Sequence, residues 1–153
     1  MPFSIRSDLD KGGPSTYTTH MKLIIHTDGG SKGNPGPASI GIVIASSDGS
    51  ELLRYREDIG IKTNNEAEYT AAIRALELVK EKFVSGLESV TFYSDSQLMV
   101  RQLNGEYKVK QPHIRDFVFK VRILEAELAV PVLYNHVLRD KNKLADALVN
   151  DAA

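Results

Sequence analysis

Residues 22–28 read Lys-Leu-Ile-Ile-His-Thr-Asp, a short apolar and β-branched run that ends in an acid. Residues 90–95, Val-Thr-Phe-Tyr-Ser-Asp, repeat this arrangement. Runs of this length and composition are typical of buried strands. A carboxylate on a core-facing surface is costly unless hydrogen bonds, an opposite charge or a cation compensate it. Asp28 and Asp95 are therefore candidate functional residues.

Working outward from these two runs, the pattern predicts an α/β fold with a mixed sheet. The predicted strands are residues 23–28, 39–45, 52–59, 89–94 and 131–136. The predicted helices are residues 63–83, 96–104, 114–128 and 142 to near the C-terminus, with turns at 29–37 and 47–50. The first three strands form an antiparallel meander, and right-handed crossovers then give the sheet order 3-2-1-4-5. Helices are expected on both faces of the sheet.

Two further acids lie where the local pattern favours apolar residues. In the helix predicted over 63–83, Glu68 heads a stripe at helical spacing that continues with Ala72, Ala75, Leu76, Val79 and Phe83. Glu66 lies off this stripe, so the periodicity selects Glu68 as the functional acid. Asp146 lies in the run Leu-Ala-Asp-Ala-Leu at 144–148.

The predicted topology brings these four acids together. Asp28 and Asp95 end neighbouring parallel strands, and ligands of open α/β sheets bind outside those ends. Glu68 is in the first turn of the helix that leads to the fourth strand, and Asp146 is near the start of the last helix. A single aspartate after a strand is more often a turn residue or helix cap. Four acids together indicate hard divalent cations and phosphate chemistry.

Composition restricts the other possibilities. The chain has 153 residues, 42% hydrophobic and 25% charged, which suits one domain with a real core. It has no cysteine, so thiolate chemistry and disulfides are excluded, and a cytoplasmic location is expected. The net charge is −1, although residues 101–122 hold six Lys or Arg against two acids. That excess suits either a polyanion or a solvated helix face.

The first twenty residues are polar and have no sustained period. Since His20-Met21 is also what a common cloning site leaves, we interpret residues 1–20 as an appended segment. A natural disordered arm is the alternative. The domain is then expected to cover residues 21–153.

Four blocks of sequence carry a family resemblance. They are Thr27-Asp-Gly-Gly-Ser-Lys-Gly-Asn-Pro-Gly-Pro-Ala38, Thr63-Asn-Asn-Glu-Ala-Glu-Tyr69, Tyr93-Ser-Asp-Ser-Gln97 and Asn142-Lys-Leu-Ala-Asp146. In this order they resemble ribonuclease H type 1, and the resemblance covers essentially Met21 to the end. It implies an endonuclease that cuts the RNA strand of an RNA–DNA hybrid and leaves 3′-hydroxyl and 5′-phosphate ends.

The resemblance also assigns roles to the acids. It implies that Asp28, Glu68, Asp95 and Asp146 hold two Mg²⁺ ions, which Mn²⁺ can replace. Asp28 would bridge both ions, and Asp146 would help to hold the ion that activates water. Glu68 and Asp95 would hold the ion at the leaving oxygen.

Substrate contacts are implied in the same way. Asn34, Asn64 and Asn65 match residues that contact the minor groove of the hybrid, and Thr63 matches a residue that holds a phosphate of the DNA strand. The backbone from Gly29 would approach RNA 2′-hydroxyls, which distinguish RNA from DNA. Without the resemblance, turn chemistry explains Asn34 and helix capping explains Asn64.

The chain departs from many family members in two places. The loop between the fifth strand and the last helix is short, and it lacks the catalytic histidine of long-loop members. His136 is interpreted as a strand residue, whereas Arg139 resembles the arginine of short-loop members near the scissile phosphate. The long basic handle is also absent, with residues 105–112 in its place. Hybrid affinity is then expected to be modest and salt-dependent.

Three alternatives stay open. The chain could be a non-catalytic hybrid- or RNA-binding module with this fold, although loss of one of the four acids would be the usual sign of such a role. It could be another nuclease or polynucleotidyl transferase of the same superfamily. It could also be the nuclease domain of a larger polypeptide.

Overall fold

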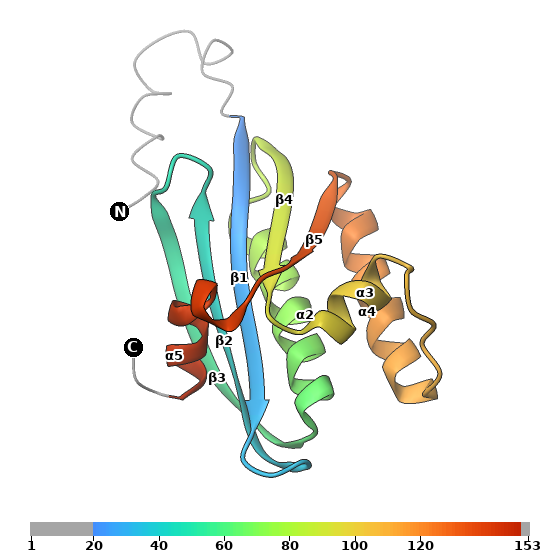
Figure 1. Cartoon of the computed structure of the whole chain (residues 1–153). Coiled ribbons are helices and arrows are strands. Elements are labelled where there is room, and N and C mark those ends of the chain that lie inside the picture. The colour runs from blue at the N-terminus through green and yellow to red at the C-terminus, as the bar shows by residue number, and fades with distance from the viewer. Residues whose placement is uncertain (1–19, 151–153) are drawn as a thin grey trace, which may run out of the picture.

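The computed structural model describes residues 20–150, and a five-stranded sheet runs through it (Figure 1). The strands are β1 (Met21–Ser31), β2 (Gly36–Ser46), β3 (Glu51–Lys62), β4 (Leu87–Ser94) and β5 (Val132–His136). The order in the sheet is β3-β2-β1-β4-β5. The β1–β2 and β2–β3 pairs are antiparallel, whereas β1–β4 and β4–β5 are parallel. The predicted order and strand directions are confirmed.

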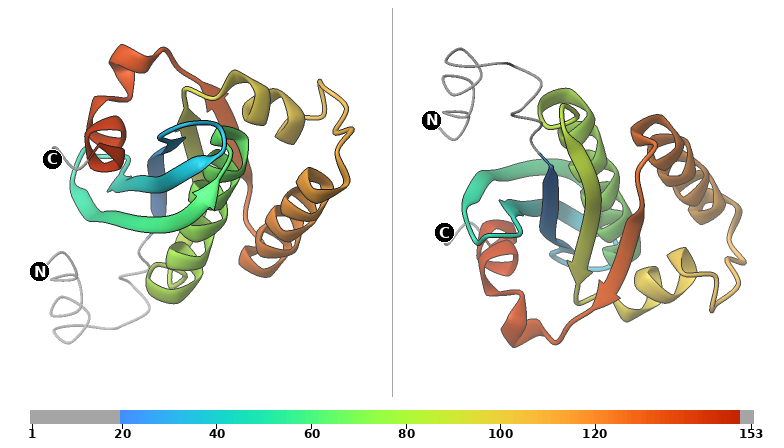
Figure 2. Two further views of the ribbon diagram at one scale, coloured as in Figure 1. Left: turned by 90° about the horizontal axis from the view of Figure 1, so that it is seen from below. Right: turned by 90° about the horizontal axis from the view of Figure 1, so that it is seen from above.

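Helices lie on both faces of this sheet, as predicted. They are α2 (Asn64–Lys82), α3 (Gln97–Leu103), α4 (Pro112–Leu128) and α5 (Lys143–Val149), with a short 3-10 helix, η3 (Arg139–Lys141). Figure 2 shows α2 on one face and α5 on the other. The helix α2 packs on β1 and β2 and carries α4 on its outer side, while α5 contacts β1, β2 and β3.

The core lies between the sheet and α2. Alternate residues of β1 and β4 point into it, including Leu23, Ile25 and Phe92, and each is fully or almost fully buried. Burying such a side chain stabilises the fold by about 1.5–3 kcal/mol. The facing side of α2 is rich in alanine, so the helix can lie close to the strands. This close packing fixes the height of the first turn of α2 above β1.

The predicted stripe on α2 is buried from Ala72 to Phe83, but it describes only part of the helix. Tyr69 and Ile73, which lie off the stripe, are buried as well. The reason is that α4 packs on a second side of α2. Single-face periodicity underestimates the burial of a helix that lies between a sheet and another helix.

The predicted turn over residues 29–37 is wrong in its extent. β1 continues through Gly29 and Gly30 to Ser31, and β2 begins at Gly36, which leaves a short connection. Glycine disfavours strands because it has no side chain to pack. Here the ladder persists, since Gly29 pairs with Ile40 and Gly30 pairs with Ser39. The short helix η3 was also predicted as loop.

Of residues 1–20, which we interpret as an appended segment, the structure describes only His20. That interpretation therefore concerns residues outside the described range. Within residues 20–150, no helix combines the length and apolar character that a membrane span requires.

Candidate active site

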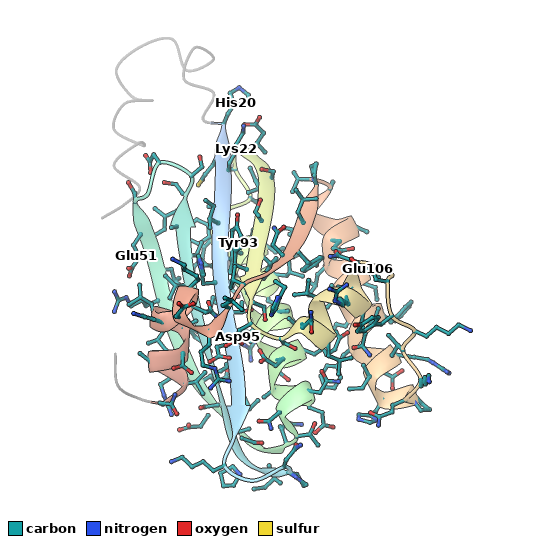
Figure 3. The ribbon with its side chains drawn as sticks, viewed as in Figure 1. His20, Lys22, Glu51, Tyr93, Asp95 and Glu106 are labelled. Atoms are coloured by element: carbon teal, nitrogen blue, oxygen red, sulfur yellow. The ribbon has the colours of Figure 1, made fainter. Side chains whose placement is uncertain are left out.

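Two acids lie side by side where β4 ends next to β1, although β1 continues past Asp28 to Ser31, so that Asp28 does not end its strand as predicted. The parallel register pairs Thr27 of β1 with Ser94 of β4, so Asp28 and Asp95 come next on the two strands. Asp95 follows β4 and lies beside β1 (Figure 3). The side chain of Asp28 is buried, and only 7% of the side chain of Asp95 is exposed. Both carboxylates are therefore held on the sheet with little access to water.

The first turn of α2 brings the third acid to this place. The backbone N–H of Gly29 donates to Oε1 of Glu68 at 3.1 Å and to Oδ1 of Asp28 at 3.0 Å. Gly29 has no room for a side chain, since a Cβ there would lie 2.4 Å from backbone atoms of Ala67. Carboxylate oxygens of Asp28, Glu68 and Asp95 all lie within 4.8 Å of one another.

The fourth acid reaches Asp28 from α5. Asp146 and Asp28 line the same cavity, and the carboxyl group of Asp146 lies close enough to raise the pKa of Asp28. Asp146 is not a member of the close group of three, and it contacts that group through Asp28. Asp28 is therefore the residue that all the other acids approach.

Crowding and burial raise the pKa of two of these acids. Burial, the nearby charge of Asp95 and the neighbouring carboxyl group of Asp146 raise the pKa of Asp28 to about 8. Burial raises the pKa of Glu68 above its usual range, and the charges of Asp28 and Asp95 add to this effect. Both shifts show that negative charge in this cluster is poorly compensated by the protein. A divalent cation supplies the missing compensation, so these residues fit a metal centre.

Arg139 contacts the cluster but is too exposed to neutralise it. Nε of Arg139 lies 3.5 Å from Oδ2 of Asp95, and 78% of the Arg139 side chain is exposed. Oδ2 of Asp95 is buried and has no hydrogen-bond partner within residues 20–150. An exposed ion pair of this kind is weak. This buried carboxylate oxygen thus has a weak ion pair but no hydrogen bond in the described part of the chain, which is a second reason to expect a cation there.

A cavity of about 680 Å³ opens beside the acids. Its walls include Asp28, Glu68, Asp146, Arg139 and Asn64. It extends along β1 and β2 to Ile61 on β3.

The residues implied in substrate binding lie at the N-terminal end of α2 and in the β1–β2 connection. Oδ1 of Asn34 accepts from the backbone N–H of Asn64 at 2.9 Å, and Oδ1 of Asn64 accepts from the backbone N–H of Ser31 at 3.0 Å. The amide oxygens are thus used inside the protein. Within residues 20–150, no hydrogen bond of their NH₂ groups is found. Asn65 lies next to them in the first turn, beside a separate surface pocket.

Thr63 and Glu66 form the N-terminal cap of α2. The backbone N–H of Glu66 donates to Oγ1 of Thr63 at 3.1 Å, and Oε1 of Glu66 accepts from the backbone N–H of Thr63 at 2.8 Å. This reciprocal pair is a capping box. Glu66 therefore has a structural role, whereas Glu68 faces the other acids. The hydroxyl proton of Thr63 stays available to an acceptor outside the protein.

Two observations concern residues near the fifth strand. His136 ends β5, is exposed and does not line the cavity, which agrees with its interpretation as a strand residue.

Asn142, in contrast, has no functional role predicted from the sequence, yet it is buried and contacts β1. Its position before the last helix is equally typical of a simple helix cap, so the sequence carried no signal that separates the two roles.

The fold and the site together define a class of protein. An α/β domain with a buried carboxylate cluster where one parallel strand ends beside another is suited to bind divalent cations beside a phosphate ester. A family model described as reverse transcriptase-like matches residues 26–152. Ribonuclease HI of Halobacterium salinarum is 39% identical over 146 residues, which are 94% of this chain and 66% of that protein.

Solved structures give the same result. The crystal structure of LC11-RNase H1 in complex with RNA/DNA hybrid has a TM-score of 0.80 and 42% identity, over 85% of this chain and 95% of that one. RNase H1 from Halobacterium salinarum has a TM-score of 0.79 and 37% identity, over 86% of this chain and 96% of that one. The chain therefore belongs to the reverse transcriptase-like family and, by these relatives, to type 1 ribonuclease H. The expected family is confirmed.

Some relatives are much longer than the matched region. The bifunctional protein Rv2228c of Mycobacterium tuberculosis is 38% identical over 133 residues, which are 86% of this chain but only 35% of that protein. The chain thus spans about a third of the length of the first curated relatives that it matches.

Proposed function

We propose that this chain is an endoribonuclease that hydrolyses the RNA strand of RNA–DNA hybrids and leaves 5′-phosphate and 3′-hydroxyl ends. The observation that carries the proposal is the meeting of carboxylate oxygens of Asp28, Glu68 and Asp95 within 4.8 Å, with Asp146 beside Asp28 in the same cavity. These acids come from β1, α2, the end of β4 and α5, so no local structural need explains their meeting. The presence of all four disfavours a non-catalytic binding module.

Asp28, Glu68, Asp95 and Asp146 would hold two divalent ions, Mg²⁺ or in its place Mn²⁺. Oxygen ligands of this kind suit hard cations. When bound, a pair of such ions activates water and stabilises the departing oxygen of a phosphodiester. Asp28 lies between Asp146 and the other two acids, so it is the residue best placed to be a ligand of both ions. Asp146 would then serve one ion, and Glu68 and Asp95 would serve the other.

Arg139 would act on the substrate phosphate. Its side chain is mostly exposed, lines the cavity and lies beside Asp95. A guanidinium stays protonated and donates only, so it is suited to bind phosphate or stabilise developing negative charge rather than to accept a proton.

Selection of an RNA–DNA hybrid over other nucleic acids would depend on residues at the N-terminal end of α2. The amide oxygens of Asn34 and Asn64 are already hydrogen-bonded to backbone, which orients their NH₂ groups as donors. The minor groove of every base pair presents acceptors, so donors read its shape with little sequence preference. Asn65 would add a third amide, and Thr63 would donate its hydroxyl proton to a phosphate of the DNA strand. The backbone at Gly29 lines the cavity and would there approach a ribose 2′-hydroxyl near the acids.

The decisive test compares four labelled substrates: RNA–DNA hybrid, duplex RNA, duplex DNA and single-stranded RNA, each with Mg²⁺, with Mn²⁺ and with a chelator. We expect cleavage of the hybrid alone, only with a divalent ion, and in the RNA strand. Analysis of the product ends should give 5′-phosphate and 3′-hydroxyl. Equal cleavage of single-stranded RNA, or cleavage in the chelator, would contradict the proposal. Asp28→Asn should remove the activity and thereby exclude a contaminating nuclease.

A further inference from the structure

The helix α5 carries Asp146 but has only seven residues. A helix of this length is not stable by itself in water, because the cost of its first turn is not recovered by later hydrogen bonds. Its position must therefore be decided by contacts with the sheet. Those contacts also decide whether the carboxylate of Asp146 meets that of Asp28.

One such contact is made at the start of α5 by Asn142. This residue is 1% exposed, and its Nδ2 donates to the backbone oxygen of Thr27 at 2.9 Å. Asn142 occupies the cap position, yet its side chain does not cap the helix. Its own backbone oxygen accepts from the N–H of Asp146 at 3.0 Å. One residue therefore joins the backbone beside Asp28 to the backbone of Asp146.

The burial of Asn142 has a cost. Its Oδ1 is buried and has no hydrogen-bond partner within residues 20–150. An unsatisfied buried acceptor typically costs about 1–3 kcal/mol. An apolar side chain would avoid this cost but would lose the link to Thr27. The presence of asparagine at position 142 is thus better explained by its positioning of α5 than by a gain in folding stability.

The other end of α5 is held from β2 and β3. Nε of Arg56 donates to the backbone oxygen of Leu148 at 2.8 Å, and Oγ of Ser39 donates to that of Val149 at 2.7 Å. Between the two ends, Gly41 lets α5 lie directly on β2, since a Cβ there would be 2.4 Å from the backbone oxygen of Ala145. The last carbonyls of a helix have no partners within it, so these donors satisfy groups that would otherwise be left open.

We propose that Asn142 and Arg56 are positioning residues that hold α5 at its two ends and so keep Asp146 against Asp28. Asn142 acts at the first turn, next to the acid, and Arg56 acts from the edge strand on the last turn. Neither is proposed as a metal ligand. The inference rests on the proposed function, because its consequence is a metal centre that contains Asp146.

The first test uses the whole chain with Asn142→Ala and with Asn142→Leu, which has nearly the same size but cannot donate to Thr27. The matched control is Asn104→Ala, because Nδ2 of Asn104 also donates to a strand carbonyl, that of Tyr134 at 3.1 Å, away from the acids. Binding of Mn²⁺ is measured by calorimetry without nucleic acid, and kcat and KM for hybrid are measured against Mg²⁺ concentration. Circular dichroism confirms that each variant is folded.

Both Asn142 variants should bind Mn²⁺ about 10-fold or more weakly and need correspondingly more Mg²⁺, as expected when a group that orients a ligand is lost. KM for the hybrid should change by less than about 2-fold, and Asn104→Ala should alter only the melting temperature. If the Asn142 variants lose stability like Asn104→Ala and keep normal metal binding, the residue is merely structural and the proposal for Asn142 is overturned.

The second test separates positioning from charge at Arg56. Arg56→Gln keeps a nitrogen donor at the same number of bonds from the backbone, whereas Arg56→Met removes it. We expect Arg56→Gln to retain metal binding near that of the original protein and Arg56→Met to weaken it several-fold. If both variants lose metal affinity equally and the KM for hybrid rises, Arg56 is instead a phosphate contact. That result would overturn the proposal for Arg56. Should the unaltered chain cleave no hybrid while the metal affinities shift as expected, the positioning would stand and the proposed substrate would fail.

Discussion

The backbone N–H of Gly29 lies 3.1 Å from Oε1 of Glu68, a residue 39 positions further along the chain. This contact exists because β1 and α2 approach each other where Gly29 has no side chain. The same N–H also holds Asp28. One backbone group therefore sets the separation of two acids, and the approach of the helix to the strand sets the geometry of the site.

We expect Gly29→Ala to damage both stability and activity. The added Cβ would lie 2.4 Å from backbone atoms of Ala67, so α2 must move or β1 must bend. Overpacking of this kind typically costs about 1–3 kcal/mol. Urea unfolding measures the loss, and hybrid cleavage should fall with it because Glu68 is displaced from Asp28.

The matched control for this change is Gly30→Ala. A Cβ at that position meets only Cγ1 of Val149, at 3.4 Å, and the same loss of glycine freedom applies. Its free energy of unfolding should change by about 0.5 kcal/mol or less. Equal destabilisation by the two substitutions would show that the close approach to Ala67 is not the cause.

The contribution of Asp28 to the stability of the metal-free protein should fall as the pH rises from about 4 to 8. The unfolded chain loses the Asp28 proton near pH 3.9, whereas the folded chain keeps it until about pH 8. The folded state binds more protons over this window, so the stabilising contribution is complete below it and is lost as the pH passes through the folded pKa. Melting temperatures in a chelator between pH 4.5 and 8.5 measure the effect.

Asp28→Asn should remove much of that pH dependence and raise the melting temperature at pH 8, while it abolishes cleavage. The amide cannot ionise, so Glu68, whose pKa is also raised, would remain as a source of the same slope. Adding Mg²⁺ should stabilise the original protein, because the ion binds the folded state. Parallel pH curves for the two proteins would argue against a protonated Asp28.

Two glutamates on the same helix provide a direct comparison. Glu66→Gln should be mild in both stability and activity, because glutamine also forms the capping box with Thr63. Glu68→Gln keeps an acceptor for Gly29 but loses the charge, so cleavage should fall by at least about 10- to 100-fold, the loss typical of weaker perturbations of metal sites. Cleavage rates at saturating hybrid decide the matter, and a more severe effect at Glu66 would reverse the assignment.

Arg139→Ala should lower turnover by about 10-fold or more, with a smaller effect on hybrid KM, because a cation near the phosphate stabilises charge that develops in the transition state. Stability should change little, since the Asp95 pair is largely exposed on the arginine side. Lys141→Ala, on the same short helix, is the control for a general loss of positive charge. An effect confined to KM would make Arg139 a binding contact only.

Much of the architecture could be predicted from the sequence, since it follows from local signals. The apolar runs at residues 22–28 and 90–95, the cap at Thr63 and the apolar side of α2 each depend on neighbours a few residues away. The extent of β1 could not be predicted in this way. Glycine disfavours a strand in isolation, but the ladder with β2 and the space needed beneath α2 favour Gly29 within it. Burial of Ile73 was missed because it depends on α4.

The sequence by itself determined the order of the elements and which four acids are out of place in it, because hydrophobic periodicity and the cost of burying charge are properties of short segments. Only the tertiary structure decided that Asp146 meets the other acids through Asp28, and that Asn142 joins α5 to Thr27, 115 positions away in the chain. Such contacts depend on distances between elements, which packing fixes and which no local pattern contains.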